Sequence, residues 1–137
     1  MRVPHDWKED PFPGSCPYHG DCLEGLAAGP AIRARWGIPG ESIPSNHQAW
    51  NLESQYIATG LVNLICTVSP QRIILGGGIM KRTEVLDGIR TKIPRLLNHY
   101  LDHVQLNEKI TEYVVTPQLG NRSGLLGALA LAKQVPE

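Results

Sequence analysis

The first 21 residues contain four prolines and two glycines, and this density limits what the segment can fold into. Proline fixes φ and removes a backbone donor, so neither a helix longer than one turn nor an unbroken strand ladder can form here. We therefore expect the segment to be held by something other than regular backbone hydrogen bonds. At 137 residues the chain has the size of one domain, and the remainder must supply its core.

The composition narrows the class of protein. Thirteen Lys and Arg residues balance thirteen Asp and Glu residues, which argues against a nucleic-acid partner. Every apolar run is interrupted well before the ~18 residues that a membrane span needs, so no membrane association is expected. The N-terminus lacks an apolar signal segment, which predicts a cytoplasmic protein. In that reducing compartment the three cysteines are expected to be free thiols or metal ligands.

Beyond residue 22 the pattern becomes regular. The spacing of apolar residues predicts two short helices that meet at Gly29 and Pro30, and longer helices over about 47–68, 82–101 and 125–133. Ser45 or Asn46 is the expected cap of the helix over 47–68. The apolar segments 72–75 and 110–116 predict two strands, the first of them buried. Helices that alternate with such strands predict an α/β fold with a parallel or mixed sheet.

Cys16, His19 and Cys22 are spaced C-x2-H-x2-C within the proline-rich segment. Two thiolates and an imidazole are typical zinc ligands, and a bound ion would fasten a segment that has little regular structure. A free-thiol turn with an exposed histidine remains possible, as does a Cys16–Cys22 disulfide, which reducing conditions disfavour. His5 is a candidate for the fourth ligand. Cys66, on the predicted long helix, is interpreted as a core thiol.

Two further features carry possible chemistry. Three glycines, Gly76 to Gly78, end the first predicted strand, where bare backbone amides can approach a phosphate or a ribose closely. Such a run is about as often a simple tight turn, and neither G-x-G-x-x-G nor a Walker A motif is present. Glu24 follows Cys22 in the first turn of a predicted helix, where the helix dipole favours a carboxylate. An ordinary helix-terminal acid is an equally good interpretation of Glu24.

The segment CPYHGDCLEGLAAGPA, over 16–31, closely resembles bacterial fructokinases of the ROK family (repressors, open reading frames and sugar kinases). The segments RIILGGG, over 72–78, and LGNRSGLLGA, over 119–128, are similar to the C-terminal lobe of the same family, in the same order. The resemblance implies an α/β, actin-like, ribonuclease-H-type sugar kinase fold. It further implies a zinc-binding loop over 1–22 and a C-terminal α/β lobe over 23–137.

The resemblance also implies roles for individual residues. Cys16, His19 and Cys22 would bind structural Zn²⁺, and Glu24 would hydrogen-bond sugar hydroxyls. The ATP site would be flanked by Pro30, Gly76, Gly77, Gly78, Ile79 and Met80. The implied reaction transfers the γ-phosphoryl group of Mg·ATP to the 6-hydroxyl of D-fructose, in an enzyme expected to be a homodimer.

Phosphoryl transfer needs a base on the attacking hydroxyl and donors around the γ-phosphate. By the resemblance, the phosphate loop and the general base belong to an N-terminal lobe that this chain lacks, so no catalytic residue is expected here. We therefore expect a fructokinase activity of the full-length parent and an inactive isolated chain. The alternatives are a ROK glucokinase or other hexose kinase, a ROK repressor fragment, and a zinc-stapled interaction module.

Overall fold

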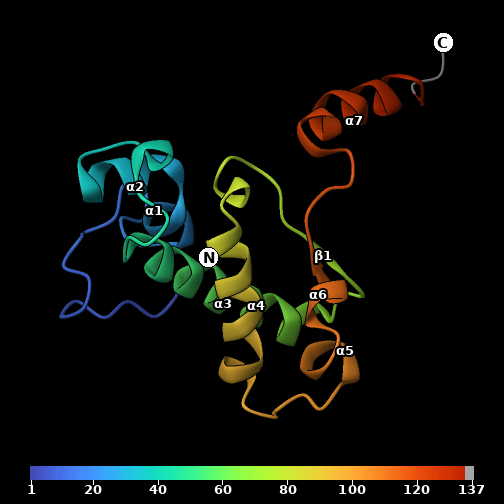
Figure 1. The fold of residues 1–137 in the computed structure, drawn as a ribbon, viewed down its shortest axis with the longest axis horizontal. Coiled ribbons are helices and arrows are strands. Elements are labelled where there is room, and N and C mark those ends of the chain that lie inside the picture. Colours follow the sequence, from blue (N-terminus) through green and yellow to red (C-terminus); the bar gives the residue numbers. More distant parts are fainter. Residues whose placement is uncertain (135–137) are drawn as a thin grey trace.

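The chain folds into a mixed α/β structure that is mostly helical (Figure 1). The computed structural model describes residues 1–134, and the backbone alone of residue 121. The helices are α1 (Leu23–Ala27), α2 (Gly29–Trp36), α3 (Ala49–Val68), α4 (Thr83–Leu97), α5 (Val104–Asn107), α6 (Ile110–Tyr113) and α7 (Ser123–Ala132). The strands are β1 (Ile73–Ile74) and β2 (Val114–Val115), and the 3-10 turns are η1 (Gly40–Ser42), η2 (Ile79–Lys81) and η3 (Gly120–Arg122).

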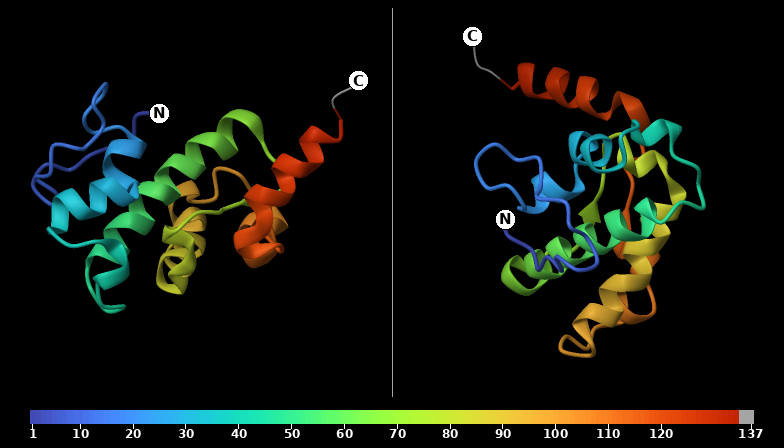
Figure 2. Two further views of the ribbon diagram at one scale, coloured as in Figure 1. Left: turned by 90° about the horizontal axis from the view of Figure 1, so that it is seen from above. Right: turned by 90° about the vertical axis from the view of Figure 1, so that its left-hand side faces the viewer.

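Helix α3 lies at the centre of the fold. Helix α4 packs along it, and α1 packs against another side of it (Figures 1 and 2). The face of α4 that carries Val85, Ile89 and Ile93 is fully buried. A Cβ at Gly88 would lie 2.6 Å from the Ser54 hydroxyl, so α4 approaches α3 closely because this position has no side chain. The main core therefore lies between α3, α4 and the strands.

The two strands pair in parallel, as predicted, with Ile73 opposite Val114 and Ile74 opposite Val115. The sheet is nevertheless much smaller than expected. The predicted strand over 110–116 is wrong in its first half, because residues 110–113 form α6. The expectation of a fully buried first strand is also wrong, because Ile74 is 63% exposed while Ile73 is buried.

The predicted helices are confirmed, with small changes at their ends. The predicted break is present but falls at Ala28, and Gly29 and Pro30 form the first turn of α2. Helix α3 covers most of the predicted range 47–68. The predicted cap is wrong: the N-cap residue of α3 is Gln48, whose side chain makes no capping hydrogen bond. The backbone amide of Ala49 donates to Nδ1 of His47 at 3.1 Å. Helix α4 ends at Leu97, earlier than predicted, with the next residue in the left-handed region.

Residues 1–22 form no helix and only two isolated β-bridges, as their proline content predicts. The segment is packed onto the rest of the chain. Val3 is buried in a small apolar cluster with Leu26 and Tyr56, and the amide of Leu23 donates to the carbonyl of Met1 at 2.9 Å. The division into 1–22 and 23–137 stays a prediction, and residues 135–137 lie outside the described part.

Helix α7 projects away from the body of the molecule (Figure 1). None of its residues is buried. Four of its leucines are exposed, namely Leu125, Leu126, Leu129 and Leu131. Within residues 1–134, no helix combines the length and the apolar character needed to cross a bilayer.

Candidate functional site

The C-x2-H-x2-C loop brings its three candidate ligands together. One ligand atom from each of Cys16, His19 and Cys22 can be chosen so that all lie within 4.8 Å of one another. The loop closes through a pair of backbone hydrogen bonds between Cys16 and Gly20, of 2.9 and 3.3 Å. Cys16 and Cys22 are free thiols, so no disulfide bond joins them. Two sulfurs and an imidazole at this separation suit a tetrahedral Zn²⁺ with one further ligand.

The loop is seated on the helix that follows it. The amide of Ser15 donates to the carbonyl of Gly25 at 2.9 Å. A Cβ at Gly25 would lie 1.8 Å from the Gly20 carbonyl oxygen and 2.9 Å from Cβ of Cys16. Any larger residue at position 25 would therefore push the loop away from α1 and separate the three ligands.

The loop also favours the thiolate of Cys16. Hydrogen bonds from the backbone of Tyr18 and then of His19 lower the pKa of Cys16 to about 7. The Cys16 sulfur lies 3.7 Å from Nδ1 of His19. Because metal ligation by cysteine requires the thiolate, this environment is suited to a metal at neutral pH.

His5, the candidate fourth ligand, lies outside this group of three. Its Nε2 is 2.8 Å from the carbonyl oxygen of Asp10, and its Nδ1 is 3.4 Å from Oδ2 of Asp21. Both ring nitrogens are therefore engaged elsewhere. Asp21 also pairs with Arg2, so His5 helps to fix the N-terminal segment beside the loop.

Glu24, the candidate sugar ligand, lies in the first turn of α1, two residues after the buried Cys22. Glu24 is exposed to solvent and therefore available to a ligand. One turn further along, Ala27 and Ala28 reach the rim of a large cavity. The same short helix therefore carries Glu24 and connects the candidate metal loop, residues 16–22, with this cavity.

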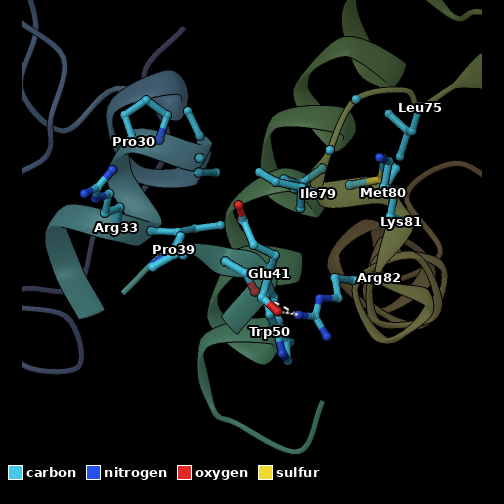
Figure 3. Close-up of a pocket in the computed structure, with 18 of the residues that line it drawn as sticks. Pro30, Arg33, Pro39, Glu41, Trp50, Leu75, Ile79, Met80, Lys81 and Arg82 are labelled. Carbon is cyan, nitrogen blue, oxygen red and sulfur yellow. Dashed lines mark hydrogen bonds between the residues drawn. The ribbon is translucent and has the colours of Figure 1, made fainter. Parts of the chain in front are cut away.

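The cavity has a volume of about 1190 Å³ and lies between α2, the η1 loop and the glycine run (Figure 3). It brings together every residue that was predicted to flank a nucleotide, although Pro30 and the glycines are far apart in the sequence. These residues are Pro30, Gly76, Gly77, Gly78, Ile79 and Met80.

The glycine run presents free backbone donors. Among residues 1–134, none of the amides of Gly76, Gly77 and Gly78 donates to a backbone carbonyl. Gly77 has a φ of 98°, a left-handed conformation that favours glycine. Nothing lies within 4 Å of a Cβ placed at Gly77 or Gly78, so this backbone is open to a ligand. Successive free amides of this kind are suited to an anion.

The remaining walls of the cavity come from residues that the sequence did not single out. Three cationic side chains, of Arg33, Lys81 and Arg82, line it together with one carboxylate, of Glu41. The excess of positive charge is suited to a phosphate-bearing ligand. Trp50 contributes an aromatic wall. No motif marks these positions, and of them only Glu41 lies in a proline- and glycine-rich segment, over 37–45.

Comparison with known proteins decides the family. The model of the ROK family matches residues 5–135. This chain belongs to the ROK family. It is 43% identical over 125 residues to a fructokinase of Streptococcus mutans, covering 90% of this chain and 41% of that protein. It is 42% identical over 123 residues to a fructokinase of Zymomonas mobilis, covering 88% of this chain and 40% of that protein.

Some less similar relatives are named as kinases of other sugars. A glucokinase of Streptomyces coelicolor is 34% identical over 105 residues, covering 76% of this chain and 30% of that protein. The ROK family implies the actin-like ATPase fold of sugar kinases. The chain spans about two fifths of the length of the fructokinases that it matches.

A buried charge cluster joins Asp10 of the N-terminal segment to α2 and α3 in this ROK protein. The Arg35 guanidinium, 5% exposed, lies 3.0 Å from Asp10 and 3.2 Å from Glu53. It also donates to the carbonyl of Leu26 at 2.9 Å, at the end of α1. The Tyr56 hydroxyl donates to the Asp10 carboxylate at 2.6 Å. The cluster thus ties the N-terminal segment and α1 to α2 and α3.

The burial of Glu53 in this cluster makes folding stability depend on pH. Burial raises the pKa of Glu53 to about 8, although Arg35 opposes the shift, whereas its ordinary value is 4.5. The folded chain therefore binds this proton more tightly than the unfolded chain. The stabilisation is complete below the unfolded value and is lost as pH rises toward about 8, by at most ~1.4 kcal/mol per pH unit.

The variant Glu53→Gln cannot ionise, so its unfolding free energy is expected to fall less steeply than that of the unsubstituted chain between about pH 5 and 8. Urea unfolding across this range measures both slopes. Glu108→Gln, at an exposed position, is the matched control and is expected to keep the original slope. Equal slopes in the Glu53→Gln variant and the unsubstituted chain would contradict the prediction.

Proposed function

We propose that this chain is the nucleotide- and sugar-binding C-terminal part of a fructokinase. The reaction of the whole enzyme transfers the γ-phosphoryl group of Mg·ATP to the 6-hydroxyl of D-fructose. The similarity to several proteins named fructokinase, at 42–46% identity, supports fructose over glucose as the sugar, because the glucokinases are more distant.

The cavity between Pro30 and the glycine run is the observation that carries the proposal. Free amides, a positive φ at Gly77 and an excess of cationic side chains all suit the phosphates of a nucleotide. In this proposal Gly76, Gly77 and Gly78 face the phosphates. Pro30, Ile79 and Met80 complete the nucleotide site.

The metal loop is proposed to hold a structural Zn²⁺ through Cys16, His19 and Cys22. Bound there, the ion would cross-link residues 1–22, which have no helix of their own. Cys22 is the N-cap residue of α1 and Glu24 lies two residues later in its first turn, so the position of Glu24 depends on this loop. We assign Glu24 the role of a hydrogen-bond acceptor for sugar hydroxyls.

Phosphoryl transfer depends mainly on positioning and on neutralising charge. The residues of this chain orient the nucleotide and the sugar, and no group among them is assigned as the general base. Mg²⁺ arrives with ATP and neutralises its phosphates. The isolated chain is therefore expected to bind ligands without turning over. The complete enzyme is proposed to be a cytoplasmic homodimer.

The nucleotide site is tested with the variant Gly78→Asp, which places a carboxylate among the free amides. Gly78 has a φ of −62°, and no atom lies within 4 Å of a Cβ placed there, so the fold should tolerate the change. We expect ADP affinity, measured by calorimetry, to fall at least ~10-fold because like charges repel. Gly124→Asp on the exposed α7 is the control. Unchanged ADP affinity in the Gly78→Asp variant would contradict the proposed site.

The sugar is tested by joining this chain to the part of the Streptococcus mutans fructokinase that it does not cover. We expect ADP formation by the chimera to depend on fructose and to be much slower with glucose. The isolated chain, in the same coupled assay, is expected to show no sugar-dependent ADP formation. Preference of the chimera for glucose would overturn the assignment of fructose, and activity of the isolated chain would overturn its expected inactivity.

A further inference from the structure

Arg82 connects two walls of the cavity that lie far apart in the sequence. Its Nη2 donates to the backbone carbonyls of Gly40 and Glu41, each at 2.9 Å (Figure 3). Its guanidinium carbon lies 4.8 Å from the centroid of the Trp50 ring, in a cation–π arrangement. One side chain therefore engages both the η1 loop and the start of α3.

The backbone of Arg82 belongs to the opposite wall. Arg82 follows η2 directly, and its amide donates to the carbonyl of Ile79 at 3.0 Å. Ile79 follows the glycine run and lines the cavity. The residue is thus fixed to the glycine wall by its backbone and to the η1 wall by its side chain.

The partners of Arg82 are themselves held in place. Trp50 is buried, and its indole Nε1 donates to the carbonyl of Pro44 at 2.8 Å. Arg82 forms no ion pair within the described part of the chain, and its guanidinium is held by the two carbonyls and by the Trp50 ring. Charge-assisted hydrogen bonds of this kind are stronger than neutral ones.

We propose that Arg82 is a positioning residue that sets the separation of the η1 wall from the glycine wall and thereby the affinity of the cavity for a nucleotide. This role rests on the proposed function, because it assumes that the cavity binds the nucleotide. Arg82 acts through the two walls and needs no contact with the ligand.

The test uses Arg82→Lys, which keeps the charge but replaces the planar fork that reaches two carbonyls and stacks on the ring. ADP affinity is expected to fall roughly 10-fold, the loss expected when a charge-assisted hydrogen bond is removed. Amide hydrogen exchange over residues 38–45 is expected to accelerate in the absence of nucleotide, because the η1 wall is no longer held.

Arg90→Lys is the matched control. Arg90 lies on α4, which begins directly after Arg82, and it likewise donates to two backbone carbonyls, those of Thr111 and Val114, but it does not line the cavity. We expect this variant to lose stability while keeping the ADP affinity and the exchange rate over 38–45. Equal effects of both variants on these two measurements would show general loosening and overturn the role of Arg82.

The outcomes separate this role from the proposed function. If the unsubstituted chain binds no ADP, the nucleotide site itself is wrong, and the role of Arg82 in nucleotide affinity fails with it. If the unsubstituted chain binds ADP and Arg82→Lys binds it equally well, or leaves exchange over 38–45 unchanged, only the role of Arg82 is overturned.

Discussion

Exchange of Cys16 for serine is expected to abolish stoichiometric zinc binding and to release residues 1–22 from α1. The three candidate ligand atoms lie within 4.8 Å of one another, so the exchange removes one of the three candidate ligands found in the described part of the chain. Zinc sites of this type stabilise small folds by about 10 kcal/mol or more, and ligand loss removes much of that free energy. Bound zinc, measured by elemental analysis, is expected to fall from about one equivalent to less than ~0.1.

Cys66→Ser is the control for this experiment. Cys66 was interpreted as a core thiol, and that interpretation is wrong, because the residue is exposed on α3. Its exchange is expected to leave zinc content and stability unchanged. Limited proteolysis should cut residues 1–22 faster in Cys16→Ser than in Cys66→Ser. A full equivalent of zinc in Cys16→Ser would remove the basis for the metal site.

Replacement of Arg35 by methionine is expected to cost about 3–5 kcal/mol of unfolding free energy, the range for removing one partner of a buried ion pair. The guanidinium contacts Asp10, Glu53 and the carbonyl of Leu26. Asp10 and Glu53 are both buried. Without Arg35, Glu53 would have no cationic partner in the described part of the chain, and Asp10 would keep only His5. Urea unfolding at neutral pH measures the loss.

Arg33→Met on the same helix provides the comparison, because Arg33 is exposed and forms no ion pair in residues 1–134. Its cost is expected to be less than about 0.5 kcal/mol. Adding Asp10→Asn to Arg35→Met should recover part of the stability, since the uncompensated carboxylate is removed while an oxygen remains for the Tyr56 hydroxyl. Equal costs for Arg33→Met and Arg35→Met would contradict a stabilising role of the cluster.

The helices could be predicted because their signals are local. Proline and glycine mark the boundaries between α1 and α2 and after α3, and apolar spacing marks the buried face of α4 around Ile89. The predictions were wrong where the secondary structure of a segment depends on the elements packed beside it. Residues 110–113 have β-branched character, yet β1 offers only two residues for pairing, and the segment closes into α6 instead.

The candidate site likewise has one part that could be predicted from local sequence and one part that could not. The spacing of Cys16, His19 and Cys22 predicted a ligand group, because seven consecutive residues can converge on one ion without help from the rest of the fold. The contacts of Arg82 with the η1 loop and Trp50 could not be predicted. They join positions more than 30 residues apart, and no local pattern requires an arginine there.

The amino-acid sequence alone determined helices α1 to α4 and α7, the irregular N-terminal segment and the ligand spacing of the metal loop, since each follows from backbone preferences or from side chains close together in the chain. Only the tertiary structure decided which walls enclose the cavity, that Arg82 connects two of them, and that Arg35 lies buried between Asp10 and Glu53. These features arise from the packing of α2, α3 and α4, and packing brings together residues that share no local signal.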